Sequence, residues 1–320
     1  MTVTLDCLRK QNAETSNAII SHFASHPSFL RLSDAEGLQI RQRDKEDSEK
    51  LQKGIDLALE KGVLSKDFVP EPYIKVDVLG KSAEDVANEI LDHVAAHLGS
   101  SKVIVLVGLS GTGKGTTVAM LRKKLEGGGP IVTWSNGNIF RSLTLLAATW
   151  CEHNCDSKIF DINKALTKDN LATFVEMLSF GKFKGDVYDT RINGLGLDLY
   201  VSEVANTELK APKVAKNIPT VAEVTQGEVI SFAAGAIKIL GENGITVLLE
   251  GREETVNYVE TKNRFCLTLS DESLIGKRRA AQRMMASALN SIEGKNDESN
   301  ADVVKALGTS LEIMVNEITS

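Results

Sequence analysis

The chain has 320 residues, 42% of them hydrophobic, and a formal net charge of −6, which argues against nucleic-acid or membrane-surface binding through bulk positive charge. This length can bury the core of one large domain or two modest ones. The chain has four cysteines, no apolar leader and no run near the roughly 20 apolar residues of a membrane span, so we expect a cytoplasmic protein with small-molecule partners.

The two ends of the chain have the pattern of amphipathic helices. We expect an N-terminal helical extension at residues 1–35 and a C-terminal helix within residues 295–320. The polar residues 295–300 predict an exposed linker before that last helix.

An apolar run at residues 103–107 leads into a glycine-rich turn and then into a helix expected at residues 116–125. Gly108, Gly111 and Gly113 allow the backbone to wrap closely around an anion, because a Cβ would obstruct those angles or that approach. The start of the helix adds free N–H groups and a positive dipole end. The segment therefore predicts a phosphate cradle.

Lys114 stands where a lysine reaches the β- and γ-phosphates of a bound nucleotide. The match to Gly-x-x-x-x-Gly-Lys-[Ser/Thr] is complete except that Gly115 precedes Thr116, a form typical of nucleoside monophosphate kinases. The expected ATP-binding residues are Gly108, Ser110, Gly111, Thr112, Gly113, Lys114, Gly115, Thr116 and Thr117.

The next elements complete a βαβ unit. Residues 127–130 predict a turn and residues 131–134 a short buried strand. A polar turn then opens a second helix with Arg141 in its first turns, where a further anion can bind. Cys151, His153 and Cys155 follow on this helix; they are either metal ligands or, more simply, a buried face of core thiols.

The second half of the chain predicts a hairpin and two further strands. The hairpin spans residues 187–201, with Asn193-Gly194 as its turn. A strand at residues 245–249 ends in Glu250-Gly-Arg-Glu253, which places charge where α/β sheets bind ligands, and another strand covers residues 264–269. The helix after it carries Lys277, Arg278, Arg279 and Arg283, either as a solvated face or as cations that close over phosphates.

Taken together, these motifs resemble bacterial-type cytidylate kinases. The resemblance is carried by Gly108–Thr116, Asn136-Gly-Asn-Ile-Phe-Arg141, a long insertion, and Glu250-Gly-Arg-Glu253. Within the insertion, residues 202–206 and 213–221 look like the family's Glu-Val-Ala-Asn and Val-Ala-x-x-Pro-x-Val stretches. The resemblance covers residues 101 to about 290.

The family's C-terminal motifs occur instead near the N-terminus, in the same mutual order. Residues 40–50 look like the arginine-aspartate motif, 72–78 like the last strand, and 81–91 like the terminal helix. Ser82 would cap that helix, with Asp85 as its capping-box partner. A circular permutation explains this order, because compact domains often have neighbouring termini. The other interpretation is that the segment near residues 36–55 is simply a charged solvated helix.

The resemblance implies a three-layer α/β/α P-loop kinase with a five-stranded parallel sheet, a lid and an insertion that binds the acceptor nucleotide. The implied organisation is an extension at 1–35, a permuted segment at 36–100, a core at 101–150 and 241–294 with the lid helix, the insertion at 151–240, and a terminal helix at 295–320.

The resemblance also implies an ATP-dependent phosphotransferase that acts on CMP, dCMP or a related monophosphate. Lys114 would hold the donor phosphates together with Mg²⁺. Thr116 would contact the phosphates or the water molecules around the ion. Arg43, Arg279 and Arg283 would neutralise charge on the transferring group. The expected acceptor-binding residues are Asn136, Gly137, Arg141, Arg252, Glu253, Asp47 and Tyr200.

Several of these assignments have open alternatives. Asp47 is either a sugar- or base-binding group or a solvated carboxylate, and Arg252 is either a ligand or the partner of Glu250 or Glu253 in a strand-end ion pair. Tyr200 and Ala222 stand where the family has arginines. A kinase of another small anionic metabolite and a regulatory ATP-binding scaffold therefore stay open beside the nucleotide kinase.

Overall fold

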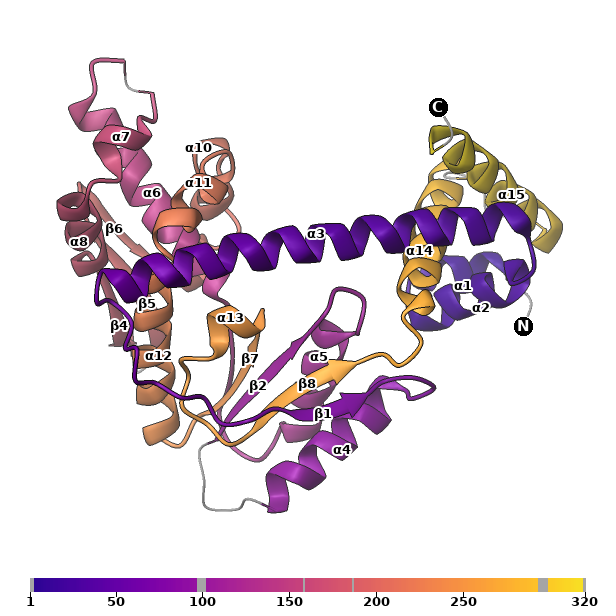
Figure 1. Ribbon diagram of the computed structural model, residues 1–320, viewed down its shortest axis with the longest axis horizontal. Coiled ribbons are helices and arrows are strands. Elements are labelled where there is room, and N and C mark those ends of the chain that lie inside the picture. Colours follow the sequence, from indigo (N-terminus) through magenta and orange to yellow (C-terminus); the bar gives the residue numbers. More distant parts are fainter. Residues whose placement is uncertain (1–2, 97–101, 158, 186, 293–298, 319–320) are drawn as a thin grey trace.

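The computed structural model describes residues 3–96, 102–157, 159–185, 187–292 and 299–318. Its centre is the expected five-stranded parallel sheet, with strand order β1-β8-β2-β7-β3 (Figure 1). The strands are β1 (Ile74–Asp77), β2 (Val103–Gly108), β3 (Ile131–Trp134), β7 (Thr246–Glu250) and β8 (Arg264–Thr268). The first strand of the chain thus lies at one edge, beside the last strand, with Ile74 opposite Phe265.

Helices cover both faces of this sheet. Ile104 and Leu106 of β2 belong to a core shared with α4 (Ala83–Ala96) and α5 (Lys114–Leu125). Val103, Val105 and Val107 of the same strand belong to the core shared with α6 (Asn136–Asn154) and α12 (Gln226–Glu242). An uninterrupted apolar strand is expected where both faces of a parallel sheet are covered.

The capping box expected at Ser82 is confirmed at the start of α4. The Asp85 N–H donates to the Ser82 hydroxyl oxygen over 3.1 Å, and the Ser82 N–H donates to the Asp85 carboxylate over 3.0 Å. Each side chain therefore satisfies a backbone donor that the helix leaves free.

The region between β3 and β7 forms a largely helical subdomain with a small antiparallel sheet, order β4-β5-β6. Cys151 and Cys155 are buried in its core, as expected for core thiols. Its elements after α6 are α7 (Ile162–Ala165), α8 (Lys168–Glu176), β4 (Leu178–Phe183), β5 (Val187–Gly194), β6 (Leu197–Tyr200), α9 (Val201–Val204), the 3₁₀ helix η1 (Glu208–Lys210), α10 (Pro212–Ala215) and α11 (Ile218–Val224).

The turn of the predicted hairpin is not Asn193-Gly194. Gly194 pairs with Leu197, so the turn is Leu195-Gly196, and both of its residues have positive φ (53° and 80°). Gly194 lies in β5 instead, where the Met177 side chain packs against it: a Cβ there would lie 2.3 Å from the Met177 sulfur. The asparagine-glycine signal was misleading because this pair lies at the end of a strand, one step before the turn.

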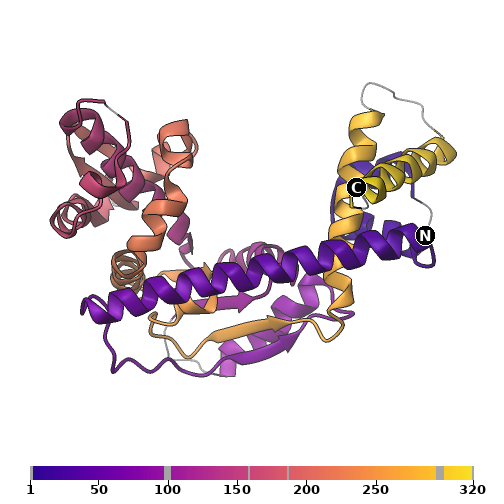
Figure 2. The same ribbon diagram turned by 45° about the horizontal axis from the view of Figure 1, so that its top comes forward.

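The terminal segments form a helical bundle around a separate hydrophobic core (Figures 1 and 2). Leu8, Ile19 and Leu32 contribute from the N-terminal side, and Met284 and Leu311 from the C-terminal side. The bundle consists of α1 (Leu5–Lys10), α2 (Ala13–Phe23), the start of α3 (Pro27–Glu60), α14 (Ser273–Ser291) and α15 (Asn300–Glu317). The boundary expected between residues 35 and 36 falls inside α3. Of the expected linker, residues 295–298 lie outside the described residues.

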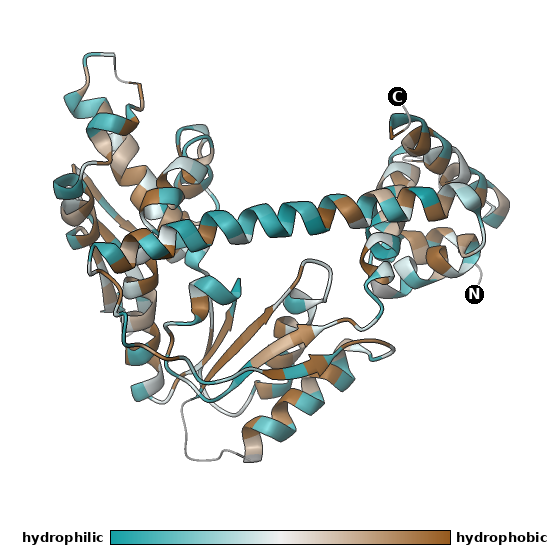
Figure 3. Ribbon diagram, in the orientation of Figure 1, coloured by the Kyte–Doolittle hydropathy of each residue, from teal (hydrophilic) through white to brown (hydrophobic). Residues whose placement is uncertain are grey.

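Helix α3 runs the length of the molecule, from the terminal bundle to α12 (Figure 2). Its last turns pack Ile55 and Ala58 against Ile230 of α12. Its middle is mostly hydrophilic (Figure 3). Among the described residues, no helix is both long and apolar enough to cross a bilayer.

Helices α3 and α14 cross at two glycines. A Cβ on Gly276 would lie 2.0 Å from the carbonyl oxygen of Ser33 and 2.9 Å from the nitrogen of Gly37. The backbones are thus in direct contact, which only residues without a side chain permit. This crossing fixes α14 against α3 immediately before Lys277, Arg278 and Arg279.

Candidate functional site

The glycine-rich loop between β2 and α5, residues 108–113, has backbone angles at its three glycines that favour glycine over other residues. Gly108, Gly111 and Gly113 have φ of 146°, 85° and 85°. A Cβ on Gly108 would lie 2.5 Å from the carbonyl oxygen of Leu267, so this position also needs the close approach of β8. The buried Thr112 hydroxyl donates to the Leu109 carbonyl over 2.8 Å and closes the loop on itself. Helix α5 starts at Lys114 and directs its first N–H groups toward the loop.

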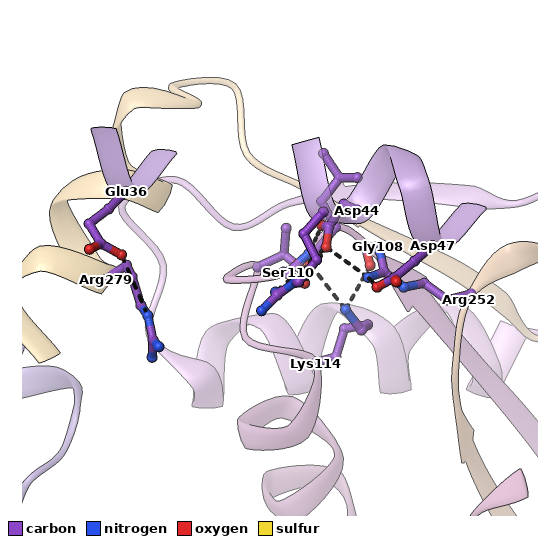
Figure 4. A network of polar contacts seen from close by, with 11 residues as sticks. Glu36, Asp44, Asp47, Gly108, Ser110, Lys114, Arg252 and Arg279 are labelled. Carbon is purple, nitrogen blue, oxygen red and sulfur yellow. Dashed lines mark hydrogen bonds and ion pairs between the residues drawn. The ribbon is translucent and has the colours of Figure 1, made fainter. Parts of the chain in front are cut away.

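Lys114 folds back over this loop. Its Nζ donates to the carbonyl oxygens of Gly108 over 2.7 Å and Leu109 over 3.0 Å (Figure 4). Burial lowers the pKa of Lys114, and the nearby Arg252 charge adds to this, whereas Glu250 and Asp44 oppose it. No carboxylate of the described residues forms an ion pair with Lys114, so a bound phosphate would supply an anionic partner.

The first turn of α5 presents Gly115 and Thr116 to solvent, while Thr117 is buried. Glu250, at the end of β7, faces this turn, because its Oε2 would lie 3.7 Å from a Cβ on Gly115. The Glu250 carboxylate thus lies beside the first turn of α5.

Asp44 on α3 is the central side chain that the sequence interpretation missed. It is 4% exposed, and it accepts from the Ser110 N–H over 2.8 Å, from the Ser110 hydroxyl over 2.7 Å and from Arg252 Nη2 over 2.7 Å (Figure 4). Its pKa is lowered to about 2: burial alone would raise it, but the hydrogen bonds from Arg252 and Ser110 and the Arg252 charge outweigh burial. Its signal was present in the arginine-aspartate motif, whose first aspartate is this residue.

Arg43 and Asp47, the residues chosen from that motif, lie beside Asp44. Arg43 Nη2 donates to the Ser110 hydroxyl oxygen over 3.1 Å. Asp47 lies 3.4 Å from Arg252 Nη2 and is about half exposed. The alternative of an ion pair between Arg252 and Glu250 or Glu253 is not what the structure shows, because Arg252 pairs with the two aspartates of α3. Glu253 instead begins the short helix α13 (Glu253–Val256).

The α14 arginines divide between two places. Arg278 Nη1 donates to the Gly111 carbonyl over 3.2 Å. Arg283 pairs with the buried Glu36 of α3 and, over 3.2 Å, with Glu317, and Arg279 lies 3.8 Å from Glu36. Figure 4 shows Glu36 and Arg279 apart from the group around Lys114. In this structure Glu36 binds Arg279 and Arg283, and Arg278 is the α14 arginine that contacts the loop. The role expected for Arg279 and Arg283 at the transferring group stays a prediction.

The start of α6 places three expected acceptor-binding residues together. Arg141 donates to Asn138 Oδ1 over 3.0 Å and lies against Gly137, where a Cβ would be 3.4 Å from its Nη1. Asn136 accepts from the Trp134 indole N–H over 2.9 Å. This orients Asn136 but uses its acceptor oxygen.

Tyr200 is not brought to the loop. It packs edge-on against Phe183, with Lys184 Nζ 4.1 Å from its ring centre. Its opposite neighbour on β5 is Arg191, whose guanidinium is held by Asp198. Tyr200 therefore belongs to the small antiparallel sheet in this structure.

A cavity of about 360 Å³ adjoins the loop at the carboxyl ends of β2 and β8. Its polar lining includes Asp44, Ser48, Arg252, Glu253 and Thr268. The carboxyl edge of a parallel sheet is where ligands of α/β proteins bind. The cavity thus joins the loop, α3 and the end of β7 in one concave region.

The lowered pKa of Asp44 predicts a specific loss of stability in acid. The ordinary pKa of 3.8 falls to about 2 in the folded protein, so the ionised group stabilises folding above pH 4, and this stabilisation is lost as pH falls to 2. It amounts to about 2 kcal/mol at neutral pH. Urea unfolding of Asp44→Asn between pH 6 and pH 2 should show a flatter pH dependence than wild type. An equal slope in both proteins would contradict the assignment.

Comparisons with protein-family models, curated proteins and solved structures find no match for this chain.

Proposed function

We propose that this chain is an ATP-dependent nucleoside monophosphate kinase of the P-loop type, with CMP, dCMP or a related monophosphate as acceptor. The observation that carries the proposal is the convergence of Asp44 and Arg43 from α3 on Ser110 of the glycine-rich loop. A loop that merely connects a strand to a helix has no need of cations and a buried carboxylate delivered from a distant segment.

The position of the N-terminal elements supports a circular permutation. Strand β1 lies beside β8, and α3 packs on α14, as they would if the chain ran from β8 through α14 and α3 to β1 and α4. Such a rearrangement keeps every packing contact and changes only where the chain is cut. It accounts for a motif that precedes the loop in sequence and adjoins it in space.

The reaction needs two anionic substrates to be aligned and their charge neutralised. Lys114, the loop amides and the α5 N-terminus would bind the donor phosphates. Arg43, Arg252 and Arg278 surround the loop and would neutralise the transferring group. Arg141 would bind the acceptor phosphate.

The residues present also fit Mg²⁺. Thr116 on the exposed first turn of α5 and Glu250 at the end of β7, which faces that turn, offer oxygen ligands, and Mg²⁺ prefers oxygen ligands while keeping several waters. When bound with ATP, the ion would supply charge neutralisation at the β- and γ-phosphate oxygens.

A kinase of another small anionic metabolite is the second candidate. It is favoured by Tyr200, which replaces an arginine of the resembled family and packs into the small sheet rather than toward Arg141. Fewer acceptor-side cations suit a smaller or differently charged acceptor.

The test is phosphoryl transfer from Mg·ATP to CMP, dCMP, UMP, AMP and a set of small carboxylic and phosphorylated acids. Lys114→Ala should weaken ATP binding by roughly 10- to 100-fold, because it removes a charge-assisted contact. Lys123→Ala, an exposed lysine on the same helix, is the matched control and should behave as wild type. Transfer to CMP or dCMP supports the proposal. ATP binding without transfer to any acceptor would overturn it in favour of a regulatory scaffold.

A further inference from the structure

We propose that Asp44 is a positioning residue, which fixes the crest of the glycine-rich loop and the guanidinium of Arg252 in one arrangement. Its kinetic consequence rests on the proposed function, whereas its effect on the loop does not. The carboxylate belongs to α3, outside the βα unit that forms the loop, and so it ties a distant helix to the nucleotide site.

The contacts of Asp44 leave its carboxylate little freedom. One oxygen accepts from the Ser110 N–H, and the other accepts from the Ser110 hydroxyl and from Arg252. A charge this deeply buried persists only when strong donors surround it, and here all three donors come from the site. The arrangement is therefore a specific joint between α3, the loop and the end of β7.

Asp47 provides an internal comparison on the same helix. Its side chain is 45% exposed and lies 3.4 Å from Arg252 Nη2. Among the described residues it forms no hydrogen bond with the loop. The two aspartates share a charge and a helix but differ in burial and in contact with Ser110. Of the two aspartates, Asp44 is therefore the one that can hold the loop in place.

Loss of the Asp44 charge should release two groups together. Arg252 would then keep its longer contact to Asp47. Its guanidinium could move out of position, and a misplaced catalytic group lowers the reaction rate. The Ser110 N–H would lose its charged acceptor. In Asp44→Asn one oxygen becomes an NH₂ donor, which faces the Ser110 or Arg252 donors and cannot replace that oxygen.

The first experiment measures amide hydrogen exchange of the loop in the ligand-free protein. Asp44→Asn should raise exchange at Ser110 by at least 10-fold, while Asp47→Asn should leave it at the wild-type rate. Residues of α15, remote from the loop, serve as the internal reference for global opening. Unchanged exchange at Ser110 in Asp44→Asn would overturn the proposal, whether or not the protein proves to be a kinase.

The second experiment compares kcat and KM for the acceptor that the panel identifies. Asp44→Asn should lower kcat by roughly 100-fold with KM for ATP changed less than 5-fold, and Asp44→Glu should recover part of kcat. Equal kcat in Asp44→Asn and wild type would overturn the kinetic role. A wild-type protein that transfers phosphate to no acceptor would instead refute the proposed function, and the exchange result alone would then decide the role of Asp44.

Discussion

Gly276→Ala is expected to lower the free energy of unfolding by about 2–3 kcal/mol, and Gly276→Val by more. The new Cβ would lie 2.0 Å from the Ser33 carbonyl oxygen and 2.9 Å from the Gly37 nitrogen, both backbone atoms of α3. Backbone cannot rotate away as a side chain can, so α3 and α14 must separate. Because each helix also contributes to the bundle core, that separation disturbs the packing of Leu32 and Met284.

Gly308→Ala is the matched control. Gly308 lies within α15 of the same bundle, and a Cβ there would have no neighbour within 4 Å. Alanine should therefore leave stability unchanged or raise it by about 0.5–1 kcal/mol through helix propensity. Guanidinium unfolding followed by circular dichroism measures both variants. Equal stability of Gly276→Ala and Gly308→Ala would show that the helices do not touch at this crossing.

The elements nearest the glycine-rich loop were predictable because their signals are local. An apolar strand, glycines at fixed spacing and a following helix specify β2, the loop and α5 within a few residues, and the fold keeps them. The capping pair Ser82 and Asp85 was predictable for the same reason, since its partners are three residues apart.

The side-chain partners around the loop were not predictable, because they depend on contacts between distant segments. Arg252 lies at a strand end beside Glu250 and Glu253, so the sequence offered a ligand-binding role or a local ion pair for it, and no partner on α3. The structure brings Asp44 to it from 208 positions away. Within the motif on α3, the chemistry of Asp44 and Asp47 is identical, and only burial distinguishes them.

The arginines of α14 illustrate the same limit. Helical spacing places Arg279 and Arg283 on one face and Arg278 beside it, but does not say which face meets the loop. That is decided by Glu36, a buried carboxylate that lies nowhere near α14 in sequence and binds both Arg279 and Arg283. The charge cluster therefore predicted a cationic helix near the loop, but not which of its arginines contacts the loop in this structure.

These arginines give the second large expected effect, a separation of activity from stability. Arg278→Ala should lower kcat of the proposed phosphoryl transfer by roughly 10³-fold, because it removes a cation held at the Gly111 carbonyl of the glycine-rich loop. Its thermal stability should stay near wild type, since this side chain is partly exposed and forms no ion pair with a carboxylate of the described residues.

Arg283→Ala should do the opposite. It leaves Glu36, only 5% exposed in its side chain, with Arg279 at 3.8 Å as its remaining cation, which should cost about 3 kcal/mol of folding free energy. Its kcat, measured well below the melting temperature, should remain within a few-fold of wild type. If Arg283→Ala lost activity while Arg278→Ala kept it, α14 would have to rotate when nucleotide binds, and the pairing with Glu36 would be a resting contact rather than a structural one.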